Sequence, residues 1–473
     1  MSNQQYLEST AQDSKASNEV NPDLETFYQK YGDLEIKYIE PPQHSPWFTK
    51  PYALNYFHND TLYRTKNERT SSKLELFLDL VITGILSNLT SNFISKGGSG
   101  YELIKFLGLF ITVFVIWSDL KDFMNYYFND DLLQRGFVIW LLVLLITFDN
   151  NCEFIDLGDD DENTLWICVG CYSMARLSLS AMLLFYSFFI HEHKIQMRLY
   201  GISLIITSLS WFWIFQIHND SYKWIFAGFM LVIEQVIFCF SVLPWTKRKL
   251  GLEYSTALNI EHEDERFSGF VIIGIGELLY NIVSGSPLQK GLNERLTKGL
   301  SILIMGYLIM GIYNHKDGCL RATHALRRSA ITAILYIYLH APLVASLLII
   351  GDSGIELIQY HKVITEENFN ILKCFQVGLG MVLILLTGLA SLDKSRDGED
   401  SQEFSKFGRL SMRIPVAIVI IGLTWSFKMF SIGTIIWIDT GLLFICYFYE
   451  FIVMNPLNFN IRINLGLTNV QDV

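Results

Sequence analysis

Long apolar runs, separated by short polar segments, fill the chain from residue 76 to residue 453. A run of about 17 to 25 apolar residues can cross a hydrocarbon core about 30 Å thick as a helix, and a shorter run can do so when flanking side chains reach the interface. The third and eighth runs are the weakest, and the last two form a tight hairpin. We count twelve such runs, at residues 76–94, 103–118, 132–148, 165–190, 199–217, 224–243, 267–284, 299–313, 329–350, 374–391, 414–430 and 432–453.

This pattern predicts the fold class. Because backbone amides cannot stay unpaired in lipid, runs of this length and density must be helices rather than barrel strands. Composition agrees, since 51% of the residues are hydrophobic and only 18% are charged, which is too apolar for an ordinary soluble protein. The chain is therefore predicted to be an all-α, polytopic membrane protein with about twelve transmembrane helices in a lipid bilayer.

The polar ends of the chain predict its division into segments. Residues 1–70 are rich in Ser, Asn, Gln and Glu and lack the apolar core of a cleavable signal peptide. We expect this leader to be mobile up to about Pro51, and the first span to direct insertion by itself. Residues 71–455 are expected to form the transmembrane domain, and residues 456–473 a short tail.

Basic residues that flank short loops predict the orientation. They gather on the side of the leader, beginning with Arg64, Lys66, Arg69 and Lys73, whereas the loop 149–162 is acidic and contains no Lys or Arg. Both termini are therefore predicted to face the cytoplasm. No signal names a particular membrane, so the plasma membrane is the default expectation and an organelle membrane stays an alternative.

Net charge and cysteine spacing argue against two kinds of function. The net charge of −11 argues against a nucleic-acid partner, which would favour basic patches. Cys168 and Cys171 have the spacing of a metal or redox pair, but they lie inside a predicted span with no second pair nearby. We interpret them as buried apolar side chains and expect no metal and no cofactor.

Two segments of the chain share letters in the same register. The segment 75–85 reads ELFLDLVITGI, and the segment 265–275 reads ERFSGFVIIGI, so both keep Glu, Phe, Val-Ile and Gly-Ile at matching positions. Six predicted spans separate the two segments, and an even number makes related halves run in the same direction. The repeat therefore predicts two parallel six-helix halves, at residues 71–250 and 260–455, as in transporters built from stacked halves.

Four ionisable residues fall near the middle of predicted spans, where a charge that faced lipid would cost several kcal/mol. The economical arrangement turns Arg176, Glu234, Glu277 and His340 toward one shared interior, with Arg176 paired to one of the two acids. A carboxylate beside a histidine that titrates near neutral pH can pass a proton or hold a small cation. The alternative is a set of fixed polar contacts that only lock helices together.

Five further candidates lie at the predicted cytoplasmic ends of the first and seventh spans. Glu75 and Asp79 are four residues apart and so share a helix face, as do His262 and Arg266. Capping of a helix start would by itself explain Glu75 and Glu265. Asp79 lies one turn deeper and is not explained by capping.

Four blocks of the sequence resemble one family. The segment 75–81, ELFLDLV, is similar to the Glu-Leu-Phe-Phe-Asp-Leu-Val that opens the low-temperature-requirement A (LtrA) family, whose members are multi-pass membrane proteins of bacteria and fungi. The other blocks are residues 117–125 with the acids that follow, residues 262–277, and the segment 338–345, YLHAPLVA, which resembles the family's Tyr-Leu-His-x-Pro. The chain departs from the family where Tyr127-Phe128 replaces the usual Phe-Asp pair and loses an acid.

The resemblance strengthens some candidates without supplying a reaction. The family's biochemical activity is poorly defined, and its name reflects growth in the cold, so stress adaptation is one function that the resemblance implies. The candidates that fall on the family motif are Glu75, Asp79, Glu265, Arg266, Glu277 and His340.

Three functions fit these residues. The leading hypothesis is a secondary transporter or ion-conducting protein for protons or small cations, with Glu277, His340 and Arg176 at the midplane. The first alternative is a membrane-embedded lipid-modifying enzyme that uses the cytoplasmic-end carboxylates and histidine, although no nucleophile elbow or His-Glu-x-x-His helix appears. The second alternative is a non-catalytic membrane protein of stress adaptation, in which the charges only fix helix packing.

Overall fold

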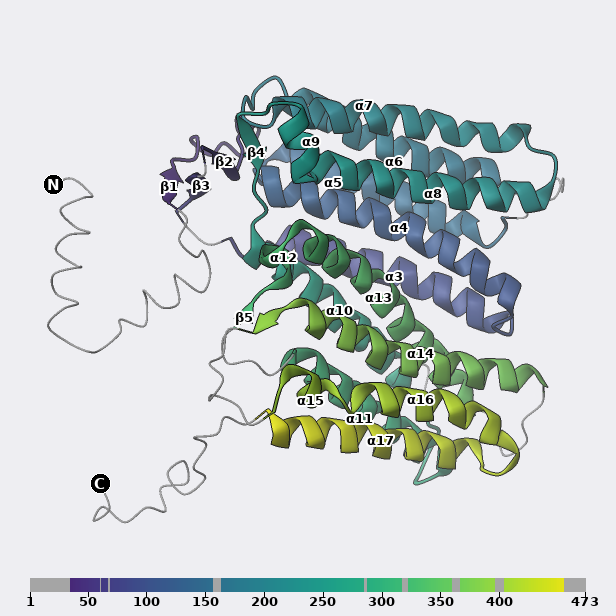
Figure 1. Ribbon diagram of the computed structural model, residues 1–473. Coiled ribbons are helices and arrows are strands. Elements are labelled where there is room, and N and C mark those ends of the chain that lie inside the picture. Colours follow the sequence, from purple (N-terminus) through teal and green to yellow (C-terminus); the bar gives the residue numbers. More distant parts are fainter. Residues whose placement is uncertain are drawn as a thin grey trace, which may run out of the picture.

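The computed structural model describes residues 35–59, 61–66, 69–155, 163–284, 287–316, 322–359, 366–395 and 404–454. Most of this chain folds into one bundle of roughly parallel and antiparallel helices, with a small sheet at one end (Figure 1). We call the end of the bundle next to this sheet the sheet end, and the opposite end the far end. The predicted tail and most of the predicted mobile leader lie outside the described residues.

Twelve membrane-spanning helices are present in the described part of the chain, as the hydrophobic pattern predicts. Two of the spans include a short 3-10 helix that continues the main helix. The spans are built from α3 (Lys73–Ser95), α4 (Gly100–Tyr127), α5 (Leu132–Cys152), α6 (Leu165–Tyr186), α7 (Lys194–Ser210) with η1 (Trp211–Gln216), α8 (Asp220–Val242), α10 (Ile260–Val283), α11 (Glu294–His315), α13 (Ala330–Gln359), α14 (Glu366–Leu392), α16 (Arg413–Leu423) with α15 (Lys406–Leu410) and η2 (Thr424–Lys428), and α17 (Ile432–Val453).

Polar caps set where the spans begin. Ser72 precedes α3 and forms a capping box with Glu75, in which each side chain bonds the backbone N–H of the other residue. Ser99 caps α4 and Asn259 caps α10 in the same way, with a side-chain oxygen accepting from the third residue of the helix. These contacts satisfy backbone donors that the first turn leaves without a partner.

The sequence analysis does not predict the four-stranded sheet, three of whose strands precede the first span. Its strand order is β1-β3-β2-β4, with β1 parallel to β3 and the other pairs antiparallel. Because β4 comes from the segment between α8 and α10, the sheet ties the leader to the middle of the chain. The described part of the leader is therefore structured well before Pro51. The strands and short helices are β1 (Ile36–Ile39), β2 (Asn55–His58), β3 (Thr61–Thr65), α9 (Pro244–Lys249), β4 (Tyr254–Thr256), β5 (Ala322–Thr323), α12 (Ala325–Arg328) and β6 (Lys394–Ser395).

The packing order of the helices repeats between the two halves of the bundle. In the first half α3 packs on α4 and α5, the chain continues through neighbouring pairs to α8, and α8 returns to α4. In the second half α10 packs on α11 and α13, and α17 returns to α11 in the same way. The halves meet where α3 packs against α10 and α13, near the centre of the bundle (Figure 1). The repeated order is the arrangement that two related six-helix halves would have.

Candidate functional site

A buried ionic cluster lies where the sheet ends of α3 and α10 meet. Glu75 Oε1 accepts from His262 Nε2 at 2.9 Å and lies 3.2 Å from Arg266 Nη1. Arg266 Nη2 donates to Asp79 Oδ1 at 2.6 Å. All four side chains are buried. The two i,i+4 pairs that the sequence places on single helix faces therefore face each other across the junction of the halves.

Two more side chains complete this cluster. Trp117 on α4 donates from Nε1 to the same Asp79 oxygen at 2.7 Å. Arg69, just before α3, donates to Glu75 Oε1 at 2.6 Å. Burial lowers the pKa of Arg69 from its ordinary value, and the adjacent Glu75 carboxylate opposes that shift. Glu75 thus serves as more than a helix cap, because one oxygen caps α3 while the other binds three basic groups.

A second set of buried polar groups, which the sequence analysis does not single out, adjoins the cluster. Lys121 binds Glu263 and lies 3.0 Å from Asp122 Oδ1. Asn125 donates to Glu263 Oε2 at 3.1 Å and lies 3.2 Å from His262 Nδ1. The signal for this set was the four-residue spacing of Trp117, Lys121 and Asn125 along α4, which puts all three on the face toward α10.

Glu265 does not belong to the cluster, although the sequence groups it with Arg266. Its side chain is exposed and accepts from the backbone N–H of Ser71 at 3.0 Å. The reason is helical geometry, since Glu265 lies about 100° around α10 from Arg266. Glu263, which is buried, is the acid of α10 that faces α4.

A separate buried cluster surrounds Arg176 in the first half. Arg176 binds Asp119, and its Nη2 lies 3.7 Å from Glu234 Oε2, so the predicted partner is present but a closer one comes from α4. Tyr200 donates to Asp119 at 2.6 Å, and Trp211 donates to Glu234 at 2.9 Å. Two carboxylates thus share one guanidinium, and each also accepts a hydrogen bond from an aromatic side chain.

Glu277 lies toward the far end of α10 and belongs to a third site. Ser87 on α3 donates to Glu277 Oε1 at 3.0 Å. Asp352 on α13 accepts from Asn281 at 3.1 Å, and the charged groups that act on it are Glu277 and Glu356, both acidic. Close helix packing brings these acids together, because a Cβ built at Gly351 would lie 3.1 Å from the Cα of Leu278.

His340 is buried in an aromatic setting on α13. Its Nδ1–H donates to the Tyr336 carbonyl at 2.7 Å, as the carbonyl can only accept, which leaves Nε2 without a proton in the neutral ring. The rings of Phe267 and Tyr336 each lie 4.5 Å from the imidazole, measured between centroids. Nε2 is buried and has no hydrogen-bond partner among the described residues.

The four midplane candidates therefore do not share one interior, which corrects the arrangement expected from the sequence. Arg176 and Glu234 meet, but Glu277 and His340 occupy sites of their own. The physical reason is that each finds partners on its nearest helices, which costs less than gathering all charges at one point in a low-dielectric core.

Metal ligands and family membership bear on what these sites can do. In the part of the chain that the structure describes, no group of three or more His, Cys, Asp or Glu side chains is placed to hold a metal ion. The family model described as "Bacterial low temperature requirement A protein (LtrA)" matches residues 70–448. The chain belongs to the LtrA family. No curated protein and no solved structure matches it. The matched range includes every site residue described above except Arg69.

Proposed function

We propose that this LtrA-family protein moves protons or a small cation across the membrane along α3. The observation that carries the proposal is the buried face of this helix. Polar side chains recur on it at each turn, from the sheet end to the far end, and a repeat of four or three residues keeps them on one side of the helix. They are Glu75, Asp79, Thr83, Ser87 and Thr90.

At both ends of this polar face, α10 supplies ionisable partners. Near the sheet end, Asp79 contacts Arg266, and this carboxylate lies nearly two turns inside the first residue of the span. Near the far end, Ser87 contacts Glu277, with Asp352 close by. We call the contact between this polar face of α3 and helix α10 the α3 seam. Exchange of a proton or cation between these two carboxylate sites would follow it.

Acidic groups gather around Asp352 near the far end. The charged groups that act on it are Glu277 and Glu356, and a cation bound between these acids would offset their repulsion. Asp352 Oδ2 is buried and makes no hydrogen bond to a described residue. An acceptor left open in this way is available to the transported ion.

A short apolar barrier separates the two sites. Asp79 and Ser87 are eight residues apart, which is about 12 Å along a helix axis. Phe270 and Val344 are fully buried on the helices that pack against this stretch, and Thr83 is the polar side chain of α3 between the sites. Because α3 contacts the opposite half here, a small movement between halves would open one side or the other.

Two alternatives are less well supported. Thr83 and Thr90 donate to carbonyls four residues back, a bond that structural threonines in membrane helices also make. Static packing does not, however, explain the far-end acids, which have no basic partner among the described residues. An enzyme would need access to Glu75 and His262, which are both fully buried and hydrogen-bonded to each other.

Transport by purified protein in liposomes tests the proposal. The liposomes enclose a pH-sensitive dye, and an imposed proton or cation gradient starts the flux. We expect Glu277→Gln and Asp352→Asn each to slow dye response about tenfold or more, because each removes a titrating site. Glu153→Gln is the matched control, as Glu153 is exposed beyond the far end of α5. A wild-type rate equal to that of empty liposomes, or full flux in a variant that combines Glu277→Gln with Asp352→Asn, would contradict the proposal.

A further inference from the structure

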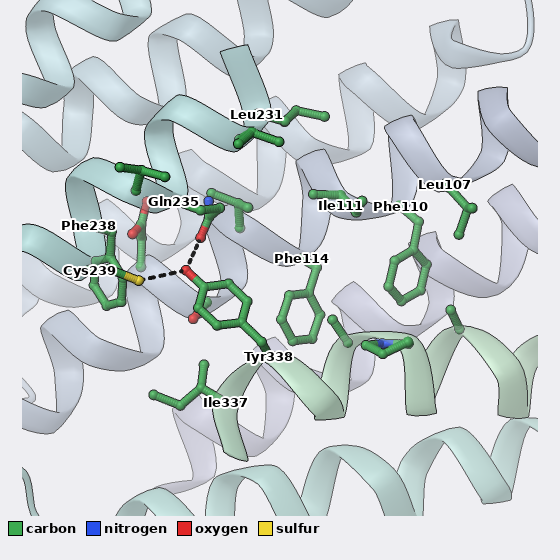
Figure 2. Close-up of a pocket in the computed structure, with 18 of the residues that line it drawn as sticks. Leu107, Phe110, Ile111, Phe114, Leu231, Gln235, Phe238, Cys239, Ile337 and Tyr338 are labelled. Carbon is green, nitrogen blue, oxygen red and sulfur yellow. Dashed lines mark hydrogen bonds between the residues drawn. The ribbon is translucent and has the colours of Figure 1, made fainter. Parts of the chain in front are cut away.

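A large cavity lies away from the α3 seam. It is a groove of about 660 Å³ between α4, α8 and α13, within the volume range of small-molecule sites. Carbon atoms make up almost all of its surface, including the rings of Phe110 and Phe114, which project into it (Figure 2). Tyr338 crosses the groove from α13 and donates to Gln235 on α8 at 2.9 Å.

The groove opens sideways to the bilayer. Val232, Val236 and Phe240 line it and are 63%, 44% and 51% exposed, although they belong to a membrane-spanning helix. Leu107 and Asp119 mark its length along α4, and twelve residues of helix span about 18 Å. One leaflet of the hydrocarbon core is about 15 Å deep, so a lipid chain could lie along the groove from the side.

Polar groups gather at one end of the groove, toward the sheet end. Asp119, Gln235 and Tyr338 line it there, together with Ser118 and Cys239. The Cys239 thiol lies 3.5 Å from the Tyr338 hydroxyl. Among the described residues, neither the amide nitrogen of Gln235 nor the hydroxyl of Ser118 makes a hydrogen bond. The groove thus offers free donors beside a carboxylate.

The charge at this end selects the head group. No Lys, Arg or His lines the groove, and the nearest guanidinium, on Arg176, is already shared by Asp119 and Glu234. The Asp119 carboxylate would repel a phosphate or a fatty-acid carboxylate. A hydroxyl fits both kinds of partner, because it can donate to Asp119 and accept from the Gln235 amide.

We propose that the groove binds an uncharged membrane lipid with a hydroxyl head. The head lies between Asp119 and Gln235, and the apolar chain follows Phe114 and Phe110 toward Leu107. Diacylglycerols, sterols and long-chain alcohols share this chemistry. The site is independent of the α3 seam, so it stands or falls separately from the proposed transport.

Photolabelling of the full-length protein in nanodiscs tests this site. The probe is a long-chain alcohol with a diazirine in its chain, and fatty-acid and alkylamine probes of equal length are the comparisons. We expect the alcohol to label peptides of α4, α8 and α13, and dioleoylglycerol to compete while dioleoyl phosphatidic acid does not. Stronger labelling by either charged probe, or equal competition by phosphatidic acid, would overturn the assignment of the head group.

Variants separate the groove from general contact with lipid. Ala341→Trp should fill the groove, and Gln235→Leu should remove the amide at similar size; each is expected to reduce labelling at least fivefold. Val143→Trp adds the same bulk on a half-exposed, bilayer-facing position of α5 outside the groove and should leave labelling unchanged. Gel filtration and thermal unfolding confirm that each variant is folded. Labelling of the folded Gln235→Leu protein at the wild-type level would overturn the proposal, as would labelling that spreads evenly over all spans.

Discussion

At the scale of single residues, burial distinguishes groups that look alike in the sequence. Glu263 and Glu265 lie two positions apart on α10, but the first is buried against Lys121 and the second is exposed. Charge inside a membrane protein is tolerated when a partner is present, and losing one partner leaves the other uncompensated. The two glutamates are therefore expected to respond very differently to the same change.

Glu263→Gln should lower thermal stability, whereas Glu265→Gln should leave it nearly unchanged. The first change weakens the partner of a buried ammonium, and the cost is on the order of 1–3 kcal/mol because Asp122 still contacts Lys121. Thermal unfolding in detergent, followed by tryptophan fluorescence, measures the difference. Adding Lys121→Met to Glu263→Gln should not restore stability, because Asp122 then loses its ammonium partner. Equal effects of the two glutamate variants would show that the ion pair is not formed.

A second residue, His193, lies outside the membrane spans and makes stability depend on pH. His193 is fully buried before α7, and burial lowers its pKa to about 3, so it stays neutral in the folded protein. The unfolded chain takes up a proton near pH 6.5. This residue therefore destabilises the fold as pH falls from about 6.5 toward 3, and adds no pH dependence above that window.

His193→Asn should flatten the acid side of the stability profile. The asparagine keeps a polar group near the Tyr127 hydroxyl, which lies 3.0 Å from His193 Nδ1, but it does not titrate. The difference in midpoint temperature between wild type and variant, measured from pH 7 to pH 4.5, should shrink as pH falls. A constant difference across that range would mean that His193 takes up its proton as readily in the folded as in the unfolded protein.

At the scale of elements, the polar face of α3 is the feature with functional consequences. Hydrophobic periodicity predicts the helix, and the spacing of Glu75 and Asp79 predicts their shared face. The same reading misses Thr83 and Ser87, because isolated hydroxyl residues are ordinary in membrane helices. Their alignment with the acids becomes meaningful only once the packing of α10 and α13 on this face is known.

Replacing Thr83 by valine tests the α3 face with little change in shape. Its hydroxyl lies between the two carboxylate sites and donates to the Asp79 carbonyl at 2.8 Å. We expect Thr83→Val to slow ion flux severalfold while changing thermal stability little. Thr112→Val is a matched control, since Thr112 makes the same 2.8 Å bond to Gly108 on α4, away from the seam. Equal flux in both variants would place the ion path elsewhere.

At the scale of the whole molecule, one contact ties the sequence repeat to the packing of the halves. Ser87 and Glu277 are 190 positions apart, which is also the offset between the segments 75–85 and 265–275, and they hydrogen-bond to each other. Equivalent residues of two subunits touch only beside a two-fold axis. For two related halves, this contact would place the approximate axis between α3 and α10.

The sequence reveals the membrane architecture because the spans are written in hydrophobic patterns, whereas the two related halves stay a prediction. It does not reveal which charged side chains meet, since that depends on how far each helix is rotated about its axis. Arg176 illustrates this limit, because the sequence places its partner Glu234 inside a predicted span. Its other partner, Asp119, lies just past the predicted span 103–118 and is not singled out as a buried acid. The sheet at the leader is missed for a related reason, as β4 lies about 200 residues from its partner β2.

Exchange of the two residues at the axis tests the symmetry and the transport proposal together. Glu277→Ser should abolish most flux, because it removes the carboxylate at the far-end site. The double variant Ser87→Glu with Glu277→Ser returns one carboxylate and one hydroxyl to the axis with their helices exchanged. We expect it to recover part of the flux in the liposome assay, and less than wild type, because Asp352 approaches from the α13 side only. A double variant as inactive as Glu277→Ser, although folded and equally incorporated, would show that the carboxylate acts from α10 alone and that the axis has no part in the ion path.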